Sequence, residues 1–158
     1  MALHVPKVVP STMGKGVTMI YTDSAQLKMV LKAPKMLKFD KNVSEPFTIM
    51  PEGVMVGFYN DSARLSHTLK ANYAIHYENS KRMEAKYNVE LYNKYGEKLN
   101  TEHLVWDEGK KKIFSDVFVK ITTAKEIIMG KGLESNQDFT KYQIKEVTGT
   151  IQLKDEEL

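Results

Sequence analysis

The sequence has 158 residues, of which 42% are hydrophobic and 27% are charged, and these proportions are typical of one folded globular domain rather than a disordered chain. Its 23 basic and 20 acidic residues give a net charge of only +3, which argues against a nucleic-acid-binding protein. Cysteine is absent, so disulfides and thiolate chemistry are excluded. No apolar run approaches the roughly 18 residues of a membrane-spanning helix, and no signal peptide is visible.

The N-terminal part predicts a lead-in followed by two strands. Residues 1–16 contain two prolines and two glycines without periodicity, and we expect a flexible lead-in there. The β-branched and aromatic residues from Val17 to Thr22 predict a strand. After a turn at Asp23, alternating apolar and polar residues predict a second strand that ends or bends at Pro34. A short further strand is expected from Met36 to Asp40.

An irregular connection over residues 41–53 separates this part from a long meander. All five prolines lie at or before position 51, so strands can follow one another without a proline from Val54 onwards. The segment beginning Asp61-Ser62-Ala63 repeats the segment beginning Asp23-Ser24-Ala25, at an offset of 38 residues. We therefore expect two similar hairpins in the first half of the chain.

Residues 73–122 contain the same hairpin pattern twice. Residues 75–78 return as 104–107, an offset of 29, and residues 85–91 return as 115–121, an offset of 30. The difference predicts one extra residue in the second turn. Apolar residues occupy every second position of both second strands, which predicts one buried and one solvated face. The chain thus predicts an all-β protein that continues to a final strand from Tyr142 to Leu153, with an ordinary antiparallel sandwich as the alternative to stacked repeats.

The residue types used in catalysis are not grouped in the sequence. The histidines lack metal-ligand spacing, and strand parity puts His67 on an apolar face and His76 on a polar one. Gly130 and Gly132 flank a lysine without a phosphate-loop pattern, which predicts a β-bulge or a close backbone approach. Lys110-Lys111-Lys112 is expected to be a solvated turn. We therefore predict a protein that is not an enzyme and has no catalytic residues, no cofactor and no metal.

Five segments in the second half of the chain occur in an order that resembles a known family. They are AKYNVEL at 85–91, the Tyr-Gly turn at 95–96, LNTEHLVWD at 99–107, SDVFV at 115–119 and GKGLESN at 130–136. In this order they resemble the LptA/LptC, OstA-like family of lipopolysaccharide-export proteins, and its LptC branch in particular. The resemblance covers residues 17–153, and we expect residues 154–158 to form a charged tail.

The resemblance implies a twisted antiparallel β-jellyroll, half-open, whose two sheets enclose an apolar groove that carries lipopolysaccharide by its acyl chains. Such a groove needs aliphatic and aromatic side chains and no nucleophile or base. The same rows of apolar residues would equally fill a closed sandwich core. Parity assigns the groove to Leu69, Ile75, Tyr87, Val89, Leu91, Trp106, Val117, Val119 and Ile121.

The resemblance also implies two docking edges and a location. An inner-membrane ABC transporter complex, LptBFG-like, would dock at the N-terminal edge, and a periplasmic bridge protein, LptA-like, at the C-terminal edge. The protein would lie in the periplasm, anchored to the inner membrane through a segment outside this chain. The edge residues are Val17, Met19 and Tyr21 at the first edge and Tyr142, Ile144 and Ile151 at the second.

Two alternative functions remain at this point. The first alternative is a soluble, LptA-like bridge component, which shares the fold. The second is a carbohydrate-binding or structural β-sandwich. The second alternative needs exposed aromatic side chains with polar neighbours. Candidates for that role are Tyr59, Tyr92, Tyr95 and Phe118.

Overall fold

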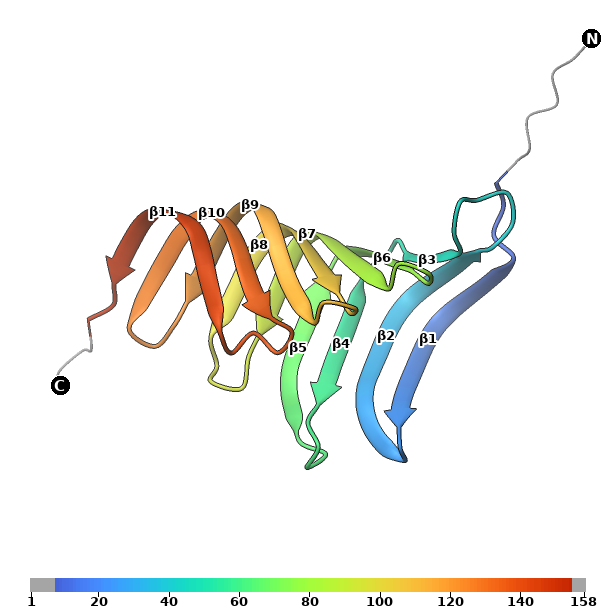
Figure 1. Cartoon of the computed structure of the whole chain (residues 1–158), viewed down its shortest axis with the longest axis horizontal. Coiled ribbons are helices and arrows are strands. Elements are labelled where there is room, and N and C mark those ends of the chain that lie inside the picture. The colour runs from blue at the N-terminus through green and yellow to red at the C-terminus, as the bar shows by residue number, and fades with distance from the viewer. Residues whose placement is uncertain (1–7, 155–158) are drawn as a thin grey trace, which may run out of the picture.

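The computed structural model describes residues 8–154, which form eleven antiparallel β-strands and, within that range, no helix (Figure 1). The all-β prediction is therefore confirmed, and the same range holds no helix able to span a membrane. The strands are β1 (Thr12–Asp23), β2 (Gln26–Phe39), β3 (Phe47–Met50), β4 (Val54–Tyr59), β5 (Leu65–Ala71), β6 (Tyr73–Tyr77), β7 (Arg82–Tyr92), β8 (Lys98–Asp107), β9 (Lys112–Thr122), β10 (Glu126–Asn136) and β11 (Tyr142–Gln152).

One continuous sheet folds into two layers because its long strands change partners along their length. The first half of β2 pairs with β4 and its second half with β3, while β7 pairs first with β6 and then with β5. In the orientation of Figure 1, β3 and β6 lie in an upper layer and β4 and β5 in a lower layer. The long strands contribute one half to each layer. This arrangement is consistent with the expected jellyroll.

The strands bend between layers at irregular positions. In β7 the ladder to β8 is interrupted between Lys86 and Val89, where Tyr87 and Asn88 have positive φ angles of 67° and 52°. In the pairing of β10 with β11, the register shifts beside Gly130. In the pairing of β10 with β9, it shifts across Gly132, whose φ is +83°. The predicted bulge at these two glycines is confirmed.

β2 bends at Pro34 and does not end there, so the residues from Met36 onwards continue the same strand. Proline lacks the N–H that a ladder requires, and Pro34 falls between the stretch paired with β4 and the stretch paired with β3. On the neighbouring strand β1, the residue opposite Pro34 is Gly16, whose φ is +57°. β1 already begins at Thr12, so residues 12–16 of the predicted lead-in belong to a strand. Residues 1–7 and 155–158 lie outside the described part.

The repeated hairpins are equivalent at a single offset of 30 residues. The β6–β7 turn closes between Tyr77 and Arg82, and the β8–β9 turn closes between Asp107 and Lys112. Each turn thus spans four residues, and the predicted extra residue in the second turn is wrong. The fourth residue of each turn has the same positive φ of 54°, and these residues are Lys81 and Lys111. Cross-strand pairing, rather than residue likeness, sets this equivalence.

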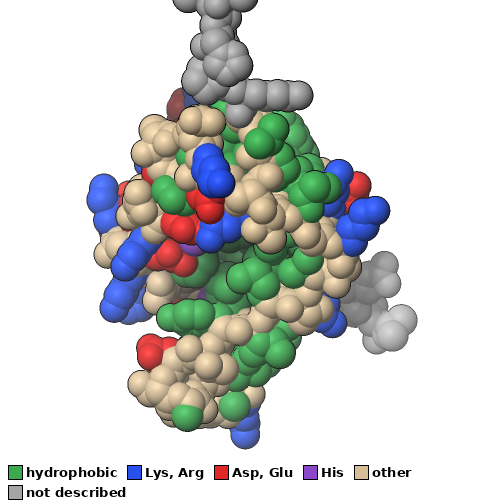
Figure 2. Space-filling view, turned by 90° about the vertical axis from the view of Figure 1, so that its right-hand side faces the viewer, with side chains coloured by type: hydrophobic (Ala, Val, Ile, Leu, Met, Phe, Trp, Pro, Cys, Tyr) green, Lys and Arg blue, Asp and Glu red, His purple; other side chains and the backbone are tan. Residues whose placement is uncertain are grey.

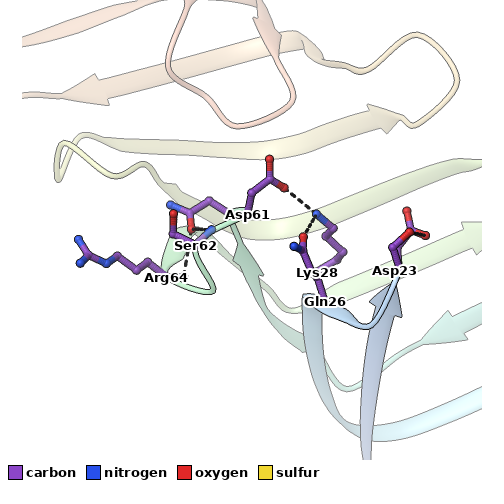
Figure 3. A network of polar contacts seen from close by, with 8 residues as sticks. Asp23, Gln26, Lys28, Asp61, Ser62 and Arg64 are labelled. Atoms are coloured by element: carbon purple, nitrogen blue, oxygen red, sulfur yellow. Dashed lines mark hydrogen bonds and ion pairs between the residues drawn. The ribbon is translucent and has the colours of Figure 1, made fainter.

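The repeat at an offset of 38 also corresponds to two similar hairpins. The β1–β2 and β4–β5 turns both contain an alanine with positive φ, 62° at Ala25 and 59° at Ala63. An ion pair joins the two hairpins, because Lys28 Nζ lies 2.8 Å from Asp61 Oδ1 (Figure 3). Asp61 is highly exposed, so this contact adds little free energy and mainly orients the turns.

Alanine at Gly130 is expected to lower the free energy of unfolding by about 1–3 kcal/mol, because its Cβ would overlap the carbonyl oxygen of Glu146 and Cγ2 of Ile144. Alanine at Gly132 is expected to cost about 1–2 kcal/mol through its left-handed backbone alone. Gly109→Ala is the control, since its Cβ would meet Asp107 Oδ1 at 3.4 Å. Urea denaturation measures all three. Equal midpoints for the Gly130 and Gly109 variants would contradict this account.

Candidate functional site: an apolar interior open at one end

A row of directly paired apolar residues crosses the inner face of the lower layer. Each member lies opposite the next across neighbouring strands. Eight strand spacings of about 4.8 Å separate β1 from β11 in this layer, so the lower layer is about 38 Å wide. The row consists of Met19, Leu31, Val56, Leu69, Leu91, Leu99, Ile121 and Ile128. It forms the floor of the space between the layers.

The floor is covered along most of its length but uncovered at the β1 end. Leu91, Leu99 and Ile121 are fully buried, whereas Met19 is 46% exposed. Tyr21, opposite Met29 on the same face of β1, is 56% exposed. Figure 2 views this end and shows a hollow between the layers where hydrophobic side chains gather. The interior is therefore half-open, as the jellyroll prediction implied.

An aromatic contact joins the two layers where the open part meets the closed part. Phe58 of the lower layer stacks on His67, with ring centroids 4.2 Å apart, and meets the indole of Trp106 from the upper layer at 5.4 Å. Burial lowers the pKa of His67 to about 4, so its imidazole is neutral near pH 7 and adds no charge to the interior. Within the described residues, Trp106 Nε1 is buried without a hydrogen-bond acceptor.

A contact between two turns, which we call the clasp, closes the other half of the interior. The β10–β11 turn inserts Phe139, which is 0% exposed and has a φ of 58°. Asn93 of the β7–β8 turn donates from Nδ2 to the Phe139 carbonyl oxygen at 2.8 Å, and the Tyr142 hydroxyl donates to Glu97 at 2.8 Å. Burial, followed by this hydrogen bond, raises the pKa of Tyr142. Sequence analysis missed Phe139, because a lone phenylalanine in a polar turn carries no periodic signal.

The structure places six of the nine predicted groove residues on the inner face of the sheet and three elsewhere. Tyr87 and Val117 share parity with their neighbours, but both lie at bends and are exposed, Tyr87 by 58%. Ile75 is buried but faces the opposite side of the sheet from the interior, because side chains alternate and its neighbour Ala74 packs in the core cluster. The six are Leu69, Val89, Leu91, Trp106, Val119 and Ile121.

Both predicted docking edges are edge strands, since β1 pairs with β2 alone and β11 with β10 alone. The side chains on these strands differ in direction. Val17, Met19 and Tyr21 lie opposite inner-face residues of β2 at the open end. Tyr142 and Ile144 pack against the core, while Ile151 is exposed.

The polar residues of the described range do not include a metal-binding group. Residues 8–154 contain no group of three or more histidine or acidic residues able to hold a metal ion. His67 lies on the apolar face as predicted. His76 does not lie on a polar outer face: it is opposite Met83 on the inner face, at the rim, with Nε2 3.6 Å from Glu108 Oε2. His103 pairs with Glu84 at 2.9 Å, and His4 lies outside the described residues.

The aromatic residues proposed for carbohydrate binding lie on different parts of the sheet. Tyr92 lies near the end of β9 that carries Thr122, because both pair with Lys98. Phe118 lies at the bend of β9, four residues from Thr122 and so about 13 Å away along the strand. Tyr59 is half-buried. Tyr92 and Phe118 therefore lie apart, while Tyr95, in the β7–β8 turn, is 65% exposed.

The family model for lipopolysaccharide-assembly, LptC-related proteins matches residues 4–152. The chain belongs to this LptC-related family. The match covers nearly all of the fold, so the resemblance seen in five short segments extends to the whole jellyroll. No curated protein sequence matches the chain. Membership of the LptC-related family implies a role in lipopolysaccharide transport, and the apolar interior is the feature of this chain suited to that role.

Phe139→Ala is expected to lower the free energy of unfolding by about 3–5 kcal/mol, because a fully buried aromatic ring is removed from the clasp. Phe118→Ala is the matched control: its ring is 57% exposed, so a change within about 0.5 kcal/mol is expected. Thermal unfolding followed by circular dichroism measures both. Equal losses in the two variants would show that Phe139 does not close the interior.

Proposed function

We propose that the chain binds lipopolysaccharide by its acyl chains between the two layers and passes it from an inner-membrane ABC transporter complex to a periplasmic bridge protein. The observation that carries this proposal is the apolar floor that runs from the exposed Met19 into the closed core. Transferring an acyl chain from water to such a surface is favourable by about 0.8 kcal/mol for each buried methylene.

The interior suits the lipid part of an amphiphile better than a polar ligand. Partly buried hydrophobic side chains flank the core at the open end, and His67 is neutral. Binding of this kind uses no nucleophile, base, metal or other cofactor. The protein is proposed to be a carrier and not an enzyme.

The two uncovered edges support head-to-tail assembly. An unpaired edge offers backbone N–H and C=O groups to a strand of another protein. We assign β1 to the LptBFG-like transporter and β11 to the LptA-like bridge. The carrier would then lie in the periplasm at the inner membrane, with its anchor outside the described residues.

A photo-crosslinking residue at position 58 is expected to capture lipopolysaccharide, and one at position 55 is not. Both positions lie on β4, but Phe58 packs against the core whereas Met55 is exposed on the opposite face. The same contrast is expected between positions 119 and 120. Mass spectrometry of the crosslinked protein reads the result. Equal labelling at 55 and 58 would refute the interior as the lipid site.

Lysine at Val147 and Ile151 is expected to abolish binding of the periplasmic partner while leaving the fold intact. Both side chains are exposed on the edge strand β11, and lysines on an edge oppose strand addition. Leu65→Lys is the control, because Leu65 is also exposed but lies on an interior strand. Surface plasmon resonance measures binding and circular dichroism the fold. Unchanged affinity in the double variant would rule out docking through β11.

A further inference from the structure

A basic groove lies at the rim of the interior, between the β8–β9 turn and the β10–β11 turn. The two turns are neighbours, because Lys112 at the start of β9 lies opposite Asn136 at the end of β10 (Figure 1). The groove has a volume of about 430 Å³, and four lysines and one carboxylate line it. These residues are Lys110, Lys111, Lys112, Lys141 and Glu134.

The charges in the groove do not cancel. Lys112 Nζ lies 2.7 Å from Glu134 Oε1, so that pair is neutral. In residues 8–154, the ammonium groups of Lys110, Lys111 and Lys141 form no ion pair. Three positive charges without an ion-pair partner therefore line one groove. Groups of ammonium donors in such a surface are suited to phosphate.

Side-chain hydrogen bonds hold the backbone of Lys110 and Lys141, and the nearby Glu108 contacts His76. Lys110 N donates to Asp107 Oδ1 at 3.0 Å, and Lys141 N donates to Asn136 Oδ1 at 2.9 Å. Glu108 faces His76. The side-chain ammonium groups are thus presented from ordered turns, and the one carboxylate that lines the groove, Glu134, is paired with Lys112.

The position of the groove links it to the interior. Trp106 is the second-last residue of β8, next to the β8–β9 turn, and its indole contacts Phe58 of the lower layer. Tyr142, which belongs to the clasp, also lines the groove. An amphiphile whose acyl chains enter beside Trp106 would have its headgroup at this rim.

We propose that the basic groove binds the phosphate groups of the glycolipid headgroup while the acyl chains occupy the interior. This inference rests on the proposed function, since it identifies the part of the same ligand that lies outside the apolar space. It makes Lys110, Lys111 and Lys141 determinants of specificity for phosphorylated over neutral glycolipids. The solvated lysine turn expected from the sequence is then one wall of a binding site.

The test measures dissociation constants of the whole chain for lipid A with both phosphates and for dephosphorylated lipid A. Lys110→Gln/Lys141→Gln is expected to weaken binding of the phosphorylated lipid at least about tenfold and to leave the dephosphorylated lipid unchanged. Lys32→Gln/Lys70→Gln removes the same charge from exposed positions away from the groove and is expected to change neither. Glu134→Gln frees Lys112 and is expected to tighten binding of the phosphorylated lipid, a gain that misfolding cannot mimic.

Several results would overturn the inference. If the groove variant and the control weaken binding equally, the effect is one of net charge. If the wild-type chain binds both lipids equally, the groove does not recognise phosphate, but the proposed binding of lipid in the interior is not contradicted. If it binds neither lipid, the proposed function fails as well. Inorganic phosphate is expected to bind at least about a hundredfold more weakly than lipid A, and equal affinity would indicate a site for free anions.

Discussion

The bends in the long strands are the constraint on which the rest of this structure depends. A flat sheet of this width would leave one apolar face in water, whereas a sheet folded across its strands buries that face against itself. The fold line requires irregular backbone in every long strand. Tyr87 and Asn88 supply it in β7 with left-handed conformations, and Gly130 with Gly132 supplies it in β10. At Gly130 the neighbouring strand is too close for any Cβ, so the approach of β11 depends on that glycine.

The folded sheet is closed unequally along its length, and this asymmetry leaves an apolar surface exposed at one end. The clasp seals the half built from β7 to β11 through Phe139, whose carbonyl oxygen accepts a hydrogen bond from Asn93. At the other end, β1 extends the inner face beyond its cover, leaving Met19 and Tyr21 in water. Exposed apolar surface next to a dry core is a favourable entry for acyl chains, because each methylene that leaves water lowers the free energy. Polar groups sit around the rim, where a headgroup would remain hydrated.

The open edges follow from the same architecture. A sheet that folds over without closing into a barrel retains two terminal strands, here β1 and β11. Such edges are a hazard for an isolated domain, because they pair with any suitable strand. Under the proposed function, these edges would be the means by which neighbouring jellyrolls join, and the apolar interior would then continue from one protein into the next.

The sequence by itself determined the local structure. Alternating apolar residues predicted strands such as β7 and β9, and Gly130 and Gly132 predicted a bulge, because both signals depend only on backbone geometry and neighbouring residues. Parity also put Leu69, Val89, Leu91, Val119 and Ile121 on the buried face. Tertiary structure decided everything that requires distant strands. Parity cannot show where a strand changes layer, so Tyr87, Val117 and Ile75 were misplaced. Nor could it find the clasp, whose residues Asn93 and Phe139 are 46 positions apart, or show that the lysines at 110–112 and Lys141 face one groove. Those contacts arise because the folded sheet brings turns together that the chain keeps apart.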